Sequence, residues 1–210
     1  MSRILKCAGS ILALAISGVG SANADDGPAR YHVEAATVVY ELGGIQSGTK
    51  TVYWDNYGRR ELAVSKTSIT AGSMTIEREE IVLTLPDFIY TIDPVARTAT
   101  RVPNPVRDMA QGQPDVVGMG LDILRNMGGT QTGTETIAGI TCDVWSVPSL
   151  HTTTCIWQGV PLSNETNMAG MTVTVRATSV VEGPVDPALF ELDPALTVRD
   201  MPAMPNLPGR

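Results

Sequence analysis

The sequence predicts a mainly β domain, built as a meandering antiparallel sheet of about ten or eleven strands with a short helix against it. Three observations predict this fold class. Apolar and polar residues alternate with period two along most of the chain. Short clusters of glycine, proline, asparagine and aspartate separate the alternating runs. A single mid-chain segment has helical spacing instead.

The first 24 residues predict an export signal. Arg3 and Lys6 precede an apolar run over residues 11–16, and small residues end at Ala22-Asn23-Ala24. This order is typical of a secretory signal peptide cleaved after Ala24, and the run is too short to span a bilayer. A buried N-terminal helix is the alternative. We therefore expect a periplasmic or secreted protein.

The composition limits the partners of the chain that follows. Beyond Ala24 there are 186 residues with 13 basic and 22 acidic side chains, a net charge of −9, and no basic run. We therefore expect no nucleic-acid partner and no stable membrane insertion. The length suits one domain, which we place at residues 25–196.

The predicted strands follow one another with short connections. The strand over residues 31–42 ends at Gly43-Gly44, and Asp55-Asn56-Tyr57-Gly58 supply a turn. The other alternating runs are residues 51–54, 59–67, 81–85, 88–93, 97–102, 132–137 and 171–181, together with a hairpin around the two late cysteines.

Cys142 and Cys155 predict a disulfide. A hairpin centred between Pro148 and Ser149 sets the two residues directly opposite each other across antiparallel strands, where a bridge can form. Export favours a disulfide over a redox site or a metal site, because the chain has no C-x-x-C and only two histidines. The bridge is worth about 3 kcal/mol by chain entropy.

The same hairpin sorts its neighbours by face. Ile140, Val144 and Trp157 share the face of the bridge, and Trp145 lies on the other face. Trp145 is thus a candidate for a second apolar surface such as a cavity wall, with ordinary core packing as the alternative.

The helical segment covers residues 113–129, with the helix itself expected near 114–127 between Pro114 and Gly128-Gly129. Gly118 and Gly120 weaken it by about 1 kcal/mol each. Such a helix either caps the core or forms a mobile lid over a ligand. Its apolar residues are candidate ligand contacts: Val117, Met119, Leu121, Leu124 and Met127.

Two further expectations concern chemistry and the C-terminus. No nucleophile elbow, zinc-binding, phosphate-loop or paired-histidine motif is present, so we expect neither enzymatic activity nor a cofactor or metal. Residues 197–210 contain Pro202, Pro205 and Pro208, and we expect a disordered tail there.

The order of several short segments resembles a known family. These segments are Tyr53-Trp-Asp-Asn-Tyr-Gly58, Thr136-Ile-Ala-Gly-Ile-Thr-Cys142, Cys155-Ile-Trp-Gln-Gly-Val-Pro-Leu162 and the closing Leu189-Phe-Glu-Leu192. Together with the apolar helix, they resemble uncharacterised bacterial periplasmic families of the LolA/LolB type. The resemblance covers about residues 30–193 and implies an unclosed half-barrel, a single curved antiparallel sheet whose hollow is covered by one or two short helices.

The resemblance also implies a function. The hollow would shelter a lipid or another hydrophobic ligand, although the basic residue expected at the cavity mouth of the lipoprotein carriers is not matched here. The alternatives are an envelope interaction protein with a filled core that binds a protein partner through a sheet edge or the tail, and a hydrolase without a recognised motif.

Overall fold

A computed structural model describes residues 28–71, 74–109, 115–168 and 170–201. The described residues form one sheet, which is not closed into a barrel, in the order β12-β6-β5-β4-β3-β2-β1-β11-β10-β9-β8-β7. Its strands are β1 (Ala36–Gly44), β2 (Gln46–Asp55), β3 (Arg60–Ala71), β4 (Met74–Thr84), β5 (Phe88–Asp93), β6 (Thr98–Pro103), β7 (Thr130–Ile137), β8 (Ile140–Val147), β9 (Thr152–Trp157), β10 (Val160–Met168), β11 (Met171–Glu182) and β12 (Thr197–Asp200). The mainly β, antiparallel prediction is confirmed.

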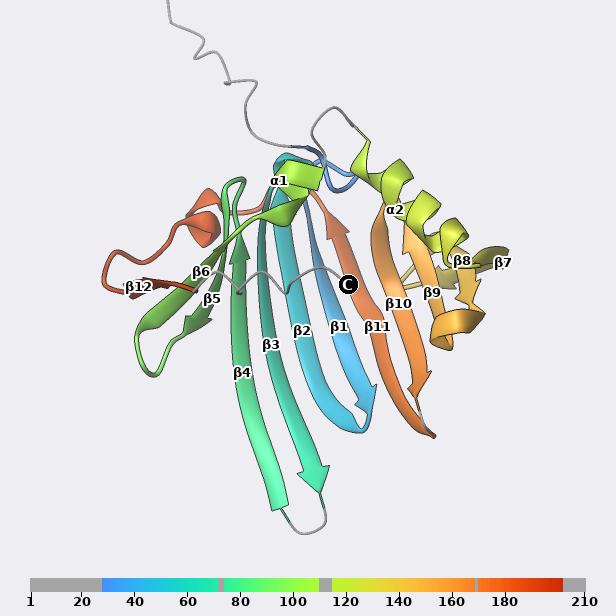
Figure 1. The fold of residues 1–210 in the computed structure, drawn as a ribbon, viewed down its shortest axis with the longest axis horizontal. Coiled ribbons are helices and arrows are strands. Elements are labelled where there is room, and N and C mark those ends of the chain that lie inside the picture. The colour runs from blue at the N-terminus through green and yellow to red at the C-terminus, as the bar shows by residue number, and fades with distance from the viewer. Residues whose placement is uncertain (1–27, 72–73, 110–114, 169, 202–210) are drawn as a thin grey trace, which may run out of the picture.

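The described helices are few and short. They are α1 (Pro105–Met109) and α2 (Val116–Asn126), with the 3-10 turns η1 (Asn56–Gly58), η2 (Pro148–Leu150) and η3 (Pro187–Phe190). Figure 1 shows α2 lying across β8–β10.

Two meanders meet at the centre of the sheet. β1 to β6 are consecutive neighbours, as are β7 to β11, and the two runs join where β11 pairs antiparallel with β1. We call β2–β6 the N-terminal wing and β7–β10 the C-terminal wing. Short turns connect neighbouring strands within each wing, which explains the closely spaced turn residues in the sequence.

Several predicted boundaries need correction. The first strand begins at Ala36, not at residue 31, because residues 30–32 instead hydrogen-bond to Tyr57 and Gln158. The sheet has twelve strands, since Thr197–Asp200 pair with β6 where we expected the tail to begin. The predicted signal peptide and the tail from Pro202 onward lie outside the described residues.

The C-terminal wing curls back toward the centre. Three strands separate β7 from β11 in the sheet, a distance of about 19 Å if the sheet were flat. Nevertheless Arg176 Nη2 of β11 donates a hydrogen bond to Glu135 Oε1 of β7 at 2.7 Å. The sheet must therefore bend strongly between these strands.

The disulfide is confirmed, but its predicted register is wrong. The Cα atoms of Cys142 and Cys155 lie 5.5 Å apart and their sulfur atoms are bonded. Cys155 is paired across the ladder with Val144, two residues from Cys142, because η2 and His151 make the connection longer than a two-residue turn. The shift of two residues preserves the faces, so Ile140, Val144 and Trp157 pack with the bridge as predicted.

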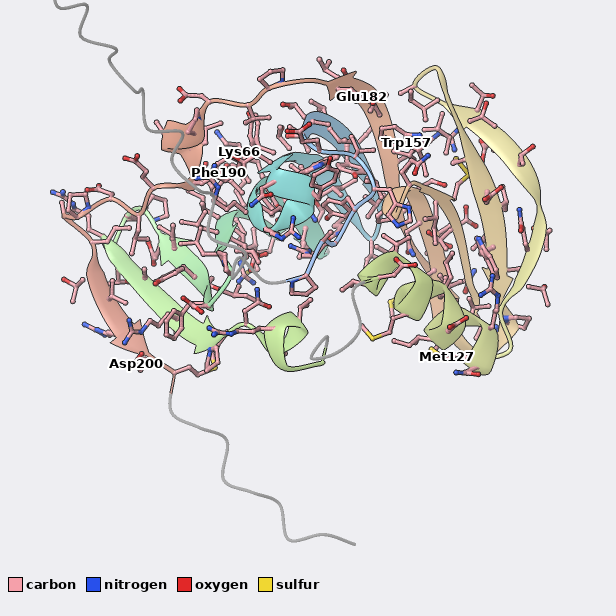
Figure 2. All side chains as sticks on the ribbon, turned by 90° about the horizontal axis from the view of Figure 1, so that it is seen from above. Lys66, Met127, Trp157, Glu182, Phe190 and Asp200 are labelled. Atoms are coloured by element: carbon pink, nitrogen blue, oxygen red, sulfur yellow. A yellow bond between two sulfur atoms is a disulfide. The ribbon has the colours of Figure 1, made fainter. Side chains whose placement is uncertain are left out.

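The two wings carry different covers. Residues 185–196, which include η3, cross the N-terminal wing and bury Phe190 against Leu83, Tyr90 and Ala99. The C-terminal wing is covered by α2 instead. Figure 2 shows these covers well apart, with Phe190 on the first and Met127 at the end of the second.

Candidate functional site

The N-terminal end of α2 is fixed by its cap. Asp115 Oδ1 accepts a hydrogen bond from the backbone N–H of Gly118 at 2.9 Å, as expected of an N-cap aspartate. This hydrogen bond, followed by the one with His32, holds the pKa of Asp115 below its usual value. Asp115 Oδ1 and His32 Nε2 are 3.3 Å apart, so the cap also ties α2 to the segment that leads into β1.

The apolar stripe of α2 lies over a hollow. No residue of α2 is fully buried, although the helix has one clearly apolar face. Between the helix and the sheet is an open hollow of about 380 Å³, within the range of small-molecule sites. The lining consists of Arg30, Tyr31, Val116, Val117, Gly120, Leu121, Leu124, Ile156, Gly159 and Pro161. The helix therefore covers the sheet without filling the space below it.

Close contact at Gly159 positions the first turn of α2. Gly159 follows β9 with a φ of +87°, and a Cβ atom there would lie 2.7 Å from Val117 Cγ2. Glycine therefore permits both the left-handed turn and the approach of the helix.

The C-terminal end of α2 rests on the hairpin of the disulfide. Ser149 Oγ donates a hydrogen bond to the carbonyl oxygen of Met127 at 2.8 Å. The Arg125 guanidinium lies 5.3 Å from the ring centroid of Trp145. Trp145 is buried and lies on the face of β8 opposite Cys142, where Arg125 of α2 lies over its ring.

One wall of the hollow carries a polar cluster. Tyr31 Oη donates a hydrogen bond to Glu61 Oε2 at 2.5 Å, and Arg30 Nη1 lies 3.3 Å from the same oxygen. Arg30 Nη1 is buried and makes no hydrogen bond within the described part of the chain. The ring of Tyr31 packs on Trp54, with centroids 4.8 Å apart, which anchors the cluster to β2.

The protonation state of Tyr31 is fixed by burial. Burial and then the charge of Glu61 raise the pKa of Tyr31 well above its ordinary value. Tyr31 therefore stays a neutral hydrogen-bond donor at any physiological pH. Arg30 and Tyr31 belong to the lining of the hollow, and their polar side-chain atoms lie against Glu61.

The structure brings together only part of the predicted ligand set. Val117, Leu121 and Leu124 line the hollow, whereas Met119, Met127 and Trp145 are not among its lining residues. Met119 instead borders the outer side of α2 with Ile123. Sequence reasoning misses Arg30 and Tyr31, because it assigns residues 31–42 to a strand. The sequence feature that could have pointed to these two residues is the adjacent Arg-Tyr pair shortly after the predicted cleavage site.

Other hollows are more polar. A cavity of about 650 Å³ is larger, but Glu34, Asp55, Arg60 and Glu182 line it, and Arg60 already pairs with Asp55. Among the described residues, no cluster of three or more metal-ligating side chains occurs. No helix of the described part is long and apolar enough to cross a membrane.

Fold and hollow together define a class: a single unclosed β-sheet with an apolar space beneath a short helix. An uncharacterised conserved protein from Thermus thermophilus is similar in structure, with a TM-score of 0.53 and 9% sequence identity over 81% of this chain and 92% of that one. At this identity the likeness concerns the fold alone.

A second similar structure is LprF from Mycobacterium bovis. Its TM-score is 0.35 and its identity 15%, over 75% of this chain and 90% of LprF. No family model matches the chain, and no curated protein matches it in sequence.

Proposed function

We propose that this protein is an exported, non-catalytic binding protein that holds a lipid or another hydrophobic ligand between α2 and the C-terminal wing. One observation carries the proposal: an amphipathic helix with no fully buried residue borders an open hollow of about 380 Å³ between itself and the sheet. Apolar side chains of a short helix normally fill the space below them, because burial is what stabilises such a helix. A hollow at this place suits an apolar guest.

The walls of the hollow indicate an amphipathic ligand. Leu121, Leu124 and Ile156 offer apolar contact, and Arg30 supplies the cationic group of the lining. The charge of Arg30 is shared with Glu61, so a ligand with a polar or anionic head group would compete with that carboxylate. Helix α2 would act as the lid, since it is held mainly through its two ends.

The proposal is tested by the cargo of the purified protein. Native mass spectrometry without detergent should detect bound lipid on the wild type. Leu121→Asp should abolish this cargo, because an acyl chain in the hollow would strip water from the new carboxylate at a large cost in free energy. Ile123→Asp is the matched control: it makes the same change on the outer side of α2, where Ile123 is 43% exposed, and should keep the cargo. Circular dichroism must show that both variants fold. Equal loading of Leu121→Asp and wild type would refute the site.

A further inference from the structure

Half of β4 has a free edge. β4 pairs with β3 along its whole length, from Met74 to Thr84, but with β5 only from Ile81 to Thr84. Among the described residues, the backbone of Met74–Glu80 therefore has no strand beside it on the outer side. Figure 1 shows this lower half of β4 extending past β5. Such an edge is a template for pairing with another extended chain.

Side chains along this edge are exposed and sorted by charge. Thr75, Glu77 and Glu79 lie on one face, and Met74, Ile76, Arg78 and Glu80 lie on the other. Glu79 is 3.6 Å from Lys66, and Arg78 pairs with Glu80. Within the described part of the chain Glu77 has no ion-pair partner. One face of the edge is thus acidic, whereas the other is apolar near the tip and neutral beyond it.

This charge pattern disfavours a second copy of the chain. Antiparallel pairing of the whole free length, residues 74–80, with itself sets Glu77 directly opposite its own counterpart. Like charges in directly opposed positions destabilise a strand pair. The charge pattern therefore disfavours this self-pairing and favours a strand of opposite charge.

The other outer edges of the sheet are less open. β12 is only four residues long, and a short edge strand binds poorly. β7 has an irregular register between Gln131 and Gly133, and its Glu135 is engaged by Arg176. The free half of β4 is longer than β12 and more regular than β7.

We propose that residues 74–80 of β4 bind an extended segment of another protein in which basic residues alternate with apolar ones. Its basic residues would face Glu77 and Glu79, and its apolar residues would lie beside Met74 and Ile76. Main-chain hydrogen bonds would provide affinity, and the alternation would provide register, as in other strand-addition complexes. This interface is distant in sequence from α2 and is independent of the ligand proposed above.

A designed peptide tests the proposal. The probe is Lys-Val-Lys-Val-Lys-Val-Lys with blocked ends, and its acidic counterpart has glutamate in place of lysine; binding is measured by fluorescence anisotropy at low salt. The wild type should bind the basic peptide and not the acidic one. Glu77→Lys/Glu79→Lys should bind the basic peptide at least about tenfold more weakly, because lysine would then face lysine across the strand pair. The same variant should accept the acidic peptide, whose glutamates would face the new lysines.

Controls separate this edge from general electrostatics. Glu41→Lys/Glu165→Lys makes the same change in charge on β1 and β10, which have partners on both sides, and should bind the basic peptide like the wild type. Hydrogen exchange should show protection of residues 74–80 in the complex, and Leu121→Asp should leave peptide binding unchanged. Absence of binding to the wild type, equal weakening by both double variants, or protection elsewhere would overturn the proposal.

Discussion

The covers of the two wings differ in how they meet the sheet. Residues 185–196 bury the ring of Phe190, which is 4% exposed, among Leu83, Tyr90 and Ala99, and Arg60 closes over it at 5.1 Å from its centroid. Helix α2 has no fully buried residue and is supported over a cavity by contacts at its ends. The first cover is part of a packed core, whereas the second leaves space.

This difference predicts that the two covers contribute unequally to stability. Close packing converts buried area into stability, and each lost side chain there leaves a cavity that costs free energy. A cover that leaves space contributes little to stability and can move at low cost. The predictions that follow test whether the two covers behave in these opposite ways.

The largest effect is expected at Phe190. Phe190→Ala should lower the free energy of unfolding by about 3–5 kcal/mol, because it leaves a cavity in a packed cluster. Denaturant titration measures this loss. Phe190→Leu, which keeps most of the volume, should cost clearly less. A loss below about 1 kcal/mol for Phe190→Ala would mean that residues 185–196 do not pack as described.

The next effect is expected at the disulfide, which lies on the face of β8 opposite α2. Reduction, or the double variant Cys142→Ser/Cys155→Ser, should cost about 3 kcal/mol through the entropy of the unfolded chain. Hydrogen exchange should rise first in β8 and β9, with the cluster around Phe190 unchanged. Melting of the reduced protein at the wild-type temperature would show that the bridge contributes no stability.

Helix α2 should tolerate a truncation that the other cover does not. Leu121→Ala removes a half-buried side chain that already borders a cavity, so the loss of stability should be at most about 1 kcal/mol. Lipid loading should nevertheless fall. The comparison with Phe190→Ala is direct, since both variants truncate one apolar side chain of a cover. Equal destabilisation by the two would remove the distinction between the covers.

The smallest effect concerns pH. The pKa of Asp115 is lowered in the folded protein by its hydrogen bond to the Gly118 amide, so its stabilising contribution is present above the unfolded pKa and is lost as the pH falls through the folded value. We expect α2 to loosen below about pH 4, at a cost of less than about 1 kcal/mol because water screens this exposed carboxylate. Amide exchange of Gly118 measures it. Asp115→Asn should weaken this dependence, whereas Asp122→Asn, within the helix, should preserve it.

Local patterns in the sequence predicted much of the fold. Alternation along residues 171–181 depends only on which face is buried, and β11 forms there. The faces of Trp145 and the disulfide were also predictable, because an error of two residues in register does not change a face. Predicting the disulfide required only two cysteines at hairpin spacing in a chain that we expected to be exported.

Long-range contacts were not predictable in the same way. Tyr31 and Val33 alternate with polar residues, as strand residues do. In the structure, however, backbone hydrogen bonds from residues 30–32 to Tyr57 and Gln158 hold this segment across the ends of other strands. Arg30 therefore reaches the hollow through tertiary contacts that no local pattern contains. β12 escaped prediction because its four residues are all exposed and carry no alternation of burial.

The central pairing of β1 with β11 has a consequence for how the chain folds. Residues 36–44 pair with residues 173–182, so this ladder joins strands that lie far apart in the chain. Contacts of such separation slow folding, because the intervening chain must be ordered before they form. Each meander can assemble from neighbouring hairpins, but the two can join only after the last long strand has been synthesised. In pulsed hydrogen exchange during refolding, we expect β3 and β4 to become protected before β1, and the halves of the molecule to combine in the slowest step.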